Sequence, residues 1–191
     1  MPRQLRHTRQ ITVDVYARDD ALWDVEVRLV DTKQRDYALE SGTRAAGDPM
    51  HDMTLNLVVD TQFNILESRA KTDWMPYPGY CNDYGGAYTQ LAGLNLLRGF
   101  RQGVKALVGD VRGCTHLSEM TQVIPTAVVQ AFAGDVLDTQ GENSDGTRGQ
   151  KPFQLDRCHA LASTAPAVLK YYPRWHVSQV GAAPIPTQNP D

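Results

Sequence analysis

The stretch GDPMHDMTLNLVVDTQFNILESRAKT, residues 47–72, decides the fold. Apolar side chains recur at every second position from Met53 to Val59. This period of two is typical of a β-strand with one buried face. DTQFN at residues 60–64 is a turn candidate, and ILESRAKT at residues 65–72 has the composition of a returning strand. The stretch therefore predicts a β-hairpin.

The same alternation occurs twice before this hairpin. Ile11, Val13 and Val15 face one way, and a second set follows the residues ARDDA. That second set consists of Trp23, Val25, Val27 and Leu29. Residues 40–49 have the composition of a loop. Together the segments predict an antiparallel sheet of about four strands.

Helical periodicity replaces the alternation after residue 73. We expect helices at about residues 86–97, 98–109 and 115–132, the last broken or kinked by Pro125. A short helix is expected near residues 158–171. Strands first and helices afterwards predict an α+β fold with the helices packed on one face of the sheet.

Composition shifts divide the chain into five segments. We expect a basic arm at residues 1–10, an α+β core domain at 11–133 and a polar loop or linker at 134–152. Residues 153–176 are expected to form a C-terminal helix that packs back on the core. The proline-rich tail, residues 177–191, is expected to be disordered.

Charge and cysteine content restrict the partners. Nineteen basic residues against 22 acidic ones give a net charge of −3, which argues against binding nucleic acid through bulk charge. No apolar run approaches the roughly 20 residues of a membrane span. Three cysteines without close spacing do not form a disulfide framework, so we expect a cytoplasmic protein. A small-molecule substrate is expected as its partner, and a homodimer is compatible with the sequence.

Four residues form the candidate metal site: His51, Cys81, Cys114 and His116. Imidazole and thiolate are ligands that zinc and iron prefer, and zinc is the expected cofactor, with iron or an iron–sulfur cluster as the alternative. Asp52 and Glu119 are the candidate acid or base groups. For each cysteine alone, a buried structural role is the competing interpretation.

Weaker candidates lie around this set. Trp74, Tyr77 and Tyr84 belong to an aromatic loop that could hold a flat substrate, or could only pack on itself. Four further pairs of residues are weaker candidates, and a simpler role competes in each case: Cys158 and His159 (a second-tier site or core filling), Asp24 and Glu26 (a solvated strand face), Asp31 and Lys33 (an ion pair), and His7 and Arg9 (an exposed basic arm).

Seven motifs distributed over residues 5–176 resemble those of a bacterial domain family of unknown function. They are HTR, LWDVE, VDTK, PMHDM, GCTHL, PFQLDRCHAL and YYPRW. No activity is assigned to that family, so this resemblance implies none. Residues 47–132 also resemble the iron–sulfur scaffold domain of the NifU/IscU type. That resemblance implies a NifU/IscU-like core whose three ligand cysteines correspond to His51, Cys81 and Cys114.

Three functions follow as hypotheses. The first is a small metal-dependent enzyme, a lyase or hydrolase, that acts on a small metabolite, either aromatic or not. The second is a scaffold or carrier for iron–sulfur clusters, as the resemblance implies; histidine at the first ligand position favours zinc or mononuclear iron instead. The third is a metal-free protein that binds a small molecule or uses Cys114 as an activated thiolate paired with His116.

Overall fold

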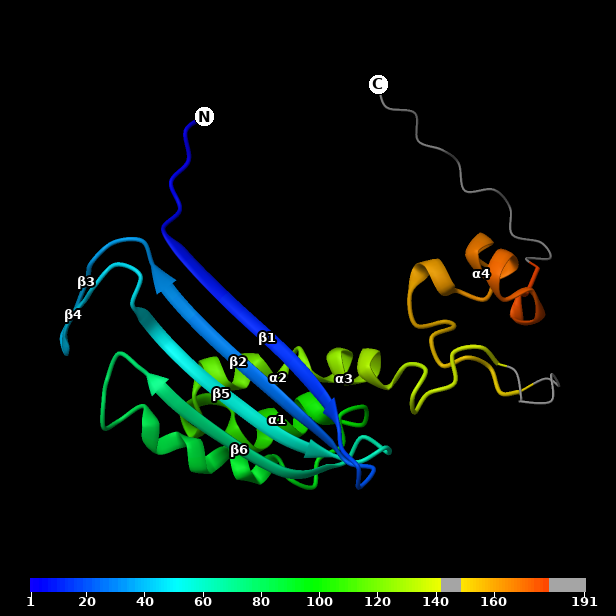
Figure 1. Cartoon of the computed structure of the whole chain (residues 1–191), viewed down its shortest axis with the longest axis horizontal. Helices are drawn as coiled ribbons and strands as arrows, with labels where there is room; N and C mark the ends of the chain where they lie inside the picture. The colour runs from blue at the N-terminus through cyan, green and yellow to red at the C-terminus, as the bar shows by residue number, and fades with distance from the viewer. Residues whose placement is uncertain (142–148, 179–191) are drawn as a thin grey trace. The chain divides into compact units, whose positions relative to one another are not determined.

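A computed structural model of the chain describes residues 1–141 and 149–178, without the side chains of Asp83 and Tyr84 (Figure 1). The chain divides into two compact units, Met1–Ala131 and Phe132–Asp191. The expected disordered tail lies outside the described residues from residue 179 onward. Part of the expected linker, residues 142–148, lies outside them as well.

The first unit is built on a four-stranded antiparallel sheet with the order β1-β2-β5-β6. Its strands are β1 (His7–Ala17), β2 (Trp23–Lys33), β5 (Pro49–Val59) and β6 (Ile65–Trp74). The predicted four-stranded sheet is confirmed, and its strands are neighbours in chain order. Strand β1 starts at His7, so the last four residues of the expected basic arm belong to the sheet.

A second hairpin, β3 (Tyr37–Leu39) and β4 (Gly42–Arg44), stands within the loop between β2 and β5. The sequence did not predict it, because three-residue strands carry almost no periodicity. The guanidinium of Arg44 lies 4.6 Å from the centroid of the Trp74 ring and donates a hydrogen bond of 3.1 Å to the carbonyl of Met75. The hairpin thereby holds the start of the aromatic loop that follows β6.

Five helical segments follow the sheet: η1 (Asn82–Leu91), α1 (Phe100–Val108), η2 (Asp110–Arg112), α2 (Thr115–Thr121) and α3 (Ile124–Phe132). The segment expected at 86–97 is the 3₁₀ helix η1 and starts earlier. The segment expected at 115–132 is two helices. Pro125 lies in the first turn of α3, where its missing N–H costs nothing, so the break falls just before it.

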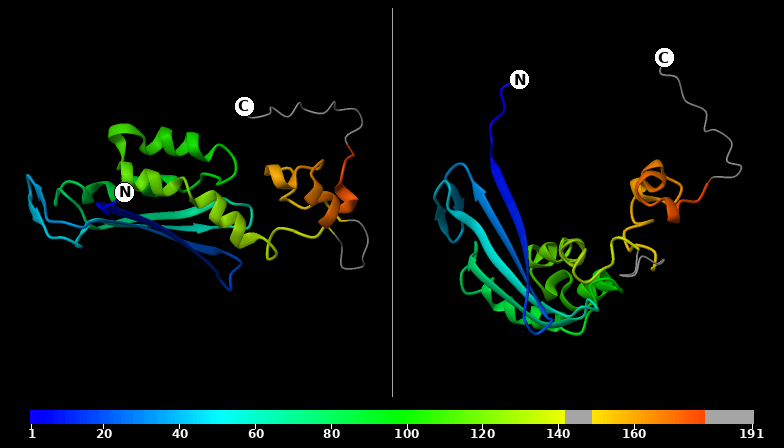
Figure 2. Two further views of the ribbon diagram at one scale, coloured as in Figure 1. Left: turned by 90° about the horizontal axis from the view of Figure 1, so that it is seen from above. Right: turned by 45° about the vertical axis from the view of Figure 1, so that its right-hand side comes forward.

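The core lies between the sheet and these helices. Figure 2 shows the helices of the first unit on one side of the sheet. Buried side chains of the sheet include Val25, Val27, Leu29, Leu55, Leu57 and Val59. Buried side chains of the helices include Val104, Val108, Leu117, Met120, Ile124 and Val128. The predicted α+β arrangement is confirmed, and the alternation in the strands follows from burial on one face.

The second unit contains only short helical segments among its described residues: η3 (His159–Leu161), α4 (Pro166–Tyr171) and η4 (Pro173–Trp175). Asp156 accepts hydrogen bonds from the backbone N–H and hydroxyl of Ser163 and pairs with Lys151. Lys151 and Ser163 together lower the pKa of Asp156 to about 2. Among the helices of the described ranges, none is long and apolar enough to span a membrane.

Candidate functional site

A row of polar side chains ends the apolar face of the sheet. Arg9 is paired with Asp31 across β1 and β2, and Asp31 is paired with His51 across β2 and β5. Asp31 continues the inward series that ends at Leu29, and His51 precedes Met53 on the same face. Three strands therefore bring a cation, a carboxylate and an imidazole together at one end of the core.

Asp31 is the centre of this row, and its side chain is only 2% exposed. Arg9 donates to both oxygens of Asp31, from Nε to Oδ1 at 2.7 Å and from Nη2 to Oδ2 at 2.6 Å. Nδ1 of His51 lies 3.0 Å from Oδ2, and Nε2 of His7 lies 3.3 Å from Oδ1. A buried carboxylate needs such partners, because an unpaired one would carry a large desolvation cost.

Helix α2 adds two side chains from above the sheet. His116 stacks on His51 with ring centroids 3.7 Å apart, and its Nε2 lies 4.0 Å from Oδ2 of Asp31. Glu119, three residues later on the same helix face, forms an ion pair with Arg9. We call Arg9, Asp31, His51 and His116 the inner cluster.

Protonation in the inner cluster follows from burial and charge. Burial lowers the pKa of both His51 and His116, and neighbouring positive charge lowers that of His116 further. Burial alone would raise the pKa of Asp31, but the hydrogen bond and charge of Arg9 outweigh it, and the pKa lies below its usual value. At neutral pH the cluster therefore holds an ionised carboxylate beside two neutral imidazoles.

The inner cluster contains a donor set for a metal ion. Among the described residues, one group of three His, Cys, Asp or Glu side chains has ligand atoms that all lie within 4.8 Å of one another: Asp31, His51 and His116. The structure thus brings together two of the four ligands predicted from the sequence. It adds a carboxylate, and Cys81 and Cys114 are outside this group.

Cys114 adjoins the group without belonging to it. Its Sγ lies 3.8 Å from Nδ1 of His116. The buried hydroxyl of Tyr88 accepts a hydrogen bond from the backbone N–H of Cys114 at 3.0 Å and donates to its carbonyl at 2.8 Å. Gly113 has no room for a side chain, since a Cβ there would come within 2.3 Å of the Val108 carbonyl oxygen. Cys114 is therefore held in a fixed position at the start of α2.

A mainly apolar pocket of about 500 Å³ opens next to Cys114. It is lined by Tyr77, Tyr80, Cys81, Gly113 and Cys114, and we call it the thiol pocket. Both predicted cysteine ligands thus line one pocket.

Of the predicted substrate contacts, the described side chains place one in the thiol pocket and one outside it. Of the aromatic residues predicted to bind substrate, Tyr77 lines it. Trp74 stacks with Arg44 instead, and the side chain of Tyr84 lies outside the described residues.

Asp52, predicted as an acid or base, is not brought to the inner cluster. It follows His51 directly, so its side chain points to the opposite face of the sheet. There it accepts hydrogen bonds of 2.8 and 2.6 Å from Arg28, which lowers the pKa of Asp52. Glu119, the other predicted acid or base, reaches the cluster only through Arg9.

The second-tier residues lie elsewhere. Asp24 and Glu26 line a shallow depression on the outer face of the sheet, where Asp24 pairs with Arg18. This is the solvated strand face that we considered as the simpler role. Cys158 and His159 belong to the second unit, and both are exposed there.

Sequence reasoning placed Asp31 and Arg9 only among the weaker candidates and assigned neither to the metal site. The signal was present: a carboxylate at Asp31 continues an inward apolar series, and such positions are rarely charged without a function or partner. The expected ion pair of Asp31 with Lys33 is replaced by the pair with Arg9, because Lys33 lies over the ring of Tyr37 at 4.6 Å.

Comparison with known protein families gives a match over most of the first unit. The family described as "Protein of unknown function (DUF2889)" matches residues 7–130, which includes every strand of the sheet and the whole inner cluster. The two C-terminal motifs, PFQLDRCHAL and YYPRW, lie outside this match. No curated protein and no solved structure matches the chain.

Proposed function

We propose that this chain, which belongs to the DUF2889 family of proteins of unknown function, binds a divalent transition metal ion at Asp31, His51 and His116. Zinc or ferrous iron fits this donor set, because two imidazoles and one carboxylate are typical of both zinc enzymes and non-haem iron centres. The metal would serve an enzyme that acts on a small apolar molecule in the thiol pocket.

The spacing of the donors carries this proposal. Ligand atoms of Asp31, His51 and His116 all lie within 4.8 Å of one another. Donors bound at about 2.0–2.2 Å from a zinc ion are necessarily separated by less than roughly 4.4 Å. Small side-chain rotations are therefore enough to close the set around an ion.

The protonation states of the two histidines also support the proposed metal site. Metal ligands must be deprotonated, so a histidine whose pKa is lowered binds metal without competition from protons at neutral pH. Burial lowers the pKa of His51 and of His116. Nδ1 of His51 lies 3.0 Å from Oδ2 of Asp31, so both atoms face the same small space, and a metal ion bound there would replace the hydrogen bond between them.

Arg9 determines how Asp31 can take part. Both oxygens of Asp31 are engaged by Arg9, while Arg9 also pairs with Glu119. A metal ion would replace Arg9 at one oxygen of Asp31, and Glu119 would retain the guanidinium. This exchange keeps the buried charges paired at every stage.

The thiol pocket supports a small, apolar substrate. Its lining is tyrosine and cysteine side chains, and its volume of about 500 Å³ falls within the range of small-molecule sites. It connects to the metal ligands through Cys114, whose Sγ is 3.8 Å from His116. A bound metal supplies Lewis acidity or an activated water at the edge of this pocket.

A metal-free enzyme is the second candidate. The series Cys114 Sγ, His116 and Asp31 is connected by separations of 3.8 and 4.0 Å, and Cys114 also lines the pocket. In that function Cys114 is the nucleophile, His116 takes its proton and Asp31 orients the imidazolium. The iron–sulfur scaffold is a further alternative, favoured by the two cysteines that line one pocket.

Metal content measured by mass spectrometry on protein purified without a metal-affinity tag tests the proposal. We expect near-stoichiometric zinc or iron, lost in His51→Ala and in His116→Ala. His159→Ala is the matched control, because His159 is exposed in the second unit. Circular dichroism shows whether each variant folds.

Each other outcome points to a different function. Folded wild-type protein without metal, even after incubation with zinc or anaerobic iron, overturns the metal proposal. Selective alkylation of Cys114 over the exposed Cys158 then favours the thiolate enzyme. Iron accompanied by acid-labile sulfide favours the cluster scaffold instead.

A further inference from the structure

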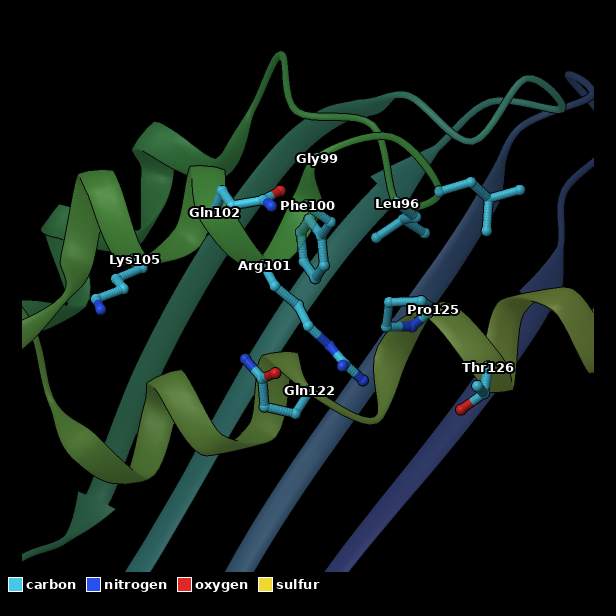
Figure 3. A pocket seen from close by; sticks show the side chains of 10 residues that line it. Leu96, Gly99, Phe100, Arg101, Gln102, Lys105, Gln122, Pro125 and Thr126 are labelled. Carbon is cyan, nitrogen blue, oxygen red and sulfur yellow. The ribbon is translucent and has the colours of Figure 1, made fainter.

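A second concave site lies in the family domain, outside the inner cluster and the thiol pocket. It is a groove of about 500 Å³ between α1 and the junction of α2 with α3 (Figure 3). Leu96, Phe100, Arg101, Lys105, Gln122 and Pro125 are among the residues that line it. We call it the cationic groove.

The floor of the cationic groove is apolar. Phe100 and Leu96 are 4% and 2% exposed, and Pro125 forms the opposite wall. Figure 3 shows the ring of Phe100 and the side chains of Leu96 and Pro125 directed into the space between the helices. The apolar part of a ligand can therefore be buried against this floor, away from water.

The rim is cationic and polar. Arg101 and Lys105 are four residues apart on α1, so they share one helix face. Figure 3 shows Arg101 reaching from α1 toward Gln122 on the facing helix. The described residues that line the groove include no aspartate or glutamate.

These two cations differ from three paired arginines of the domain. Arg9, Arg18 and Arg28 each form an ion pair with an aspartate. Among the described residues, no ion pair or hydrogen bond of the Arg101 or Lys105 side chain is found. In a chain whose net charge is −3, two such cations above an apolar floor form a local anion-attracting site.

We propose that the cationic groove binds a small amphiphilic organic anion. The anionic group, a carboxylate or sulfonate, would accept hydrogen bonds from Arg101 and Lys105, and a hydrocarbon or aromatic body would lie on Phe100 and Pro125. A charged hydrogen-bond acceptor matches the guanidinium best. The anion would also relieve the repulsion between two like charges one helical turn apart.

This site is separate from the proposed metal site. None of the residues that line the cationic groove belongs to the inner cluster or lines the thiol pocket. Binding in the groove can therefore be measured on protein whose inner cluster is unchanged, and its failure leaves the metal proposal untouched.

Fluorescence titration with 8-anilinonaphthalene-1-sulfonate, an aromatic body with one sulfonate, tests the proposal on the full chain. We expect saturable binding that is weakened about tenfold in Arg101→Gln/Lys105→Gln. Arg69→Gln/Lys71→Gln is the control, because it removes the same charge from exposed positions of β6. Thr126→Trp fills the groove without changing charge and should weaken binding as well.

Competition separates the polar from the apolar contribution. Decanoate is expected to displace the probe at concentrations at least tenfold lower than decanol. Equal displacement by the two would show an apolar patch without anion recognition and would overturn the proposal. Unchanged binding in both the charge variant and Thr126→Trp, at unchanged melting temperature, would overturn it too.

Discussion

Nδ1 of His51 and Oδ2 of Asp31 lie 3.0 Å apart, across the pairing of β2 with β5. The contact joins residues 20 positions apart in sequence and lies at the end of an otherwise apolar sheet face. His116 on α2 closes the same space from the helix side, with its ring 3.7 Å from that of His51. The inner cluster is therefore held by every layer of the domain, and changes within it should affect both stability and binding.

Replacing Asp31 with asparagine should destabilise the family domain strongly. Asp31→Asn removes a charge that is 2% exposed and that accepts two hydrogen bonds from Arg9, which then keeps only Glu119 as an ionised partner. We expect the free energy of unfolding to fall by about 3–4 kcal/mol, the lower part of the range for a broken buried pair, because Arg9 is partly exposed. Urea unfolding followed by tryptophan fluorescence measures it.

Asp52→Asn is the matched control for that change. Asp52 makes the same two-bonded pair with Arg28, but on the outer face, where Arg28 is 58% exposed. The Asp52 side chain is itself only 11% exposed, but its arginine is more exposed than Arg9, so solvent screening is stronger and a smaller loss than in Asp31→Asn is expected. Equal losses of unfolding free energy in Asp31→Asn and Asp52→Asn would show that burial does not determine how strongly the Asp31–Arg9 pair stabilises the fold.

Stability of the metal-free protein should depend on pH through the two cluster histidines. Their pKa values are lowered in the folded state, so unfolding takes up protons below the unfolded pKa of about 6.5. The histidine contribution is fully present above that pH and is lost as pH falls through it. The slope approaches about 1.4 kcal/mol per pH unit for each proton taken up.

Urea unfolding between pH 7.5 and pH 5 tests this dependence. The variant His51→Gln/His116→Gln should show a flatter profile over the same range. Asp31 affects stability only at lower pH. Its pKa is lowered on folding, so its contribution to the free energy of unfolding is lost only as the pH falls below about 4. A wild-type profile as flat as that of the double variant would contradict the burial of the imidazoles.

The fold was largely predictable from the sequence, because the main strands have ten or eleven residues and the two central strands, β2 and β5, bury alternate side chains over most of their length. The four-stranded sheet and the helices at α1 and α2 followed from periodicity. The hairpin β3–β4 did not, since each of its strands has three residues. Pro125 predicted a break, and the structure adds that it opens a new helix.

The candidate site was only partly predictable. His51 and His116 were chosen by residue type, and the structure brings them together. The sequence-based prediction paired Asp31 with Lys33, two positions later on the same strand face. A cross-strand partner lies closer in space, and in the structure that partner is Arg9. Register between β1, β2 and β5 decides that pairing, and a single sequence fixes register poorly.

The hydroxyl of Tyr88 should be needed for the position of Cys114. Tyr88→Phe removes the acceptor for the Cys114 N–H and the donor to its carbonyl. The Cys114 carbonyl still accepts from the Ser118 N–H, but the Cys114 N–H loses its acceptor, which should cost about 1–2 kcal/mol in unfolding free energy. Tyr80→Phe, whose ring is 80% exposed, should change it by less than about 0.5 kcal/mol.

Gly113 should not accept a side chain. In Gly113→Ala the new Cβ would lie 2.3 Å from the Val108 carbonyl oxygen and 2.9 Å from the Tyr88 hydroxyl. The backbone must shift, and we expect a loss of at least about 2 kcal/mol and faster alkylation of Cys114. Gly86→Ala meets no atom within 4 Å and is the control. Wild-type stability in Gly113→Ala would show that the start of α2 is not tightly packed.

Zinc should stabilise the folded family domain against heat, and a chelator should reverse the effect. A ligand that binds only the folded state at one hundred times its Kd stabilises it by about 2.7 kcal/mol. We expect the melting temperature to rise on addition of zinc to the wild-type protein and to His159→Ala, and to stay constant in His51→Ala. Magnesium should have no effect on any of them, since imidazole donors do not suit it. A rise that persists in His51→Ala would place zinc away from the inner cluster, because no other group of three donors among the described residues meets the same spacing.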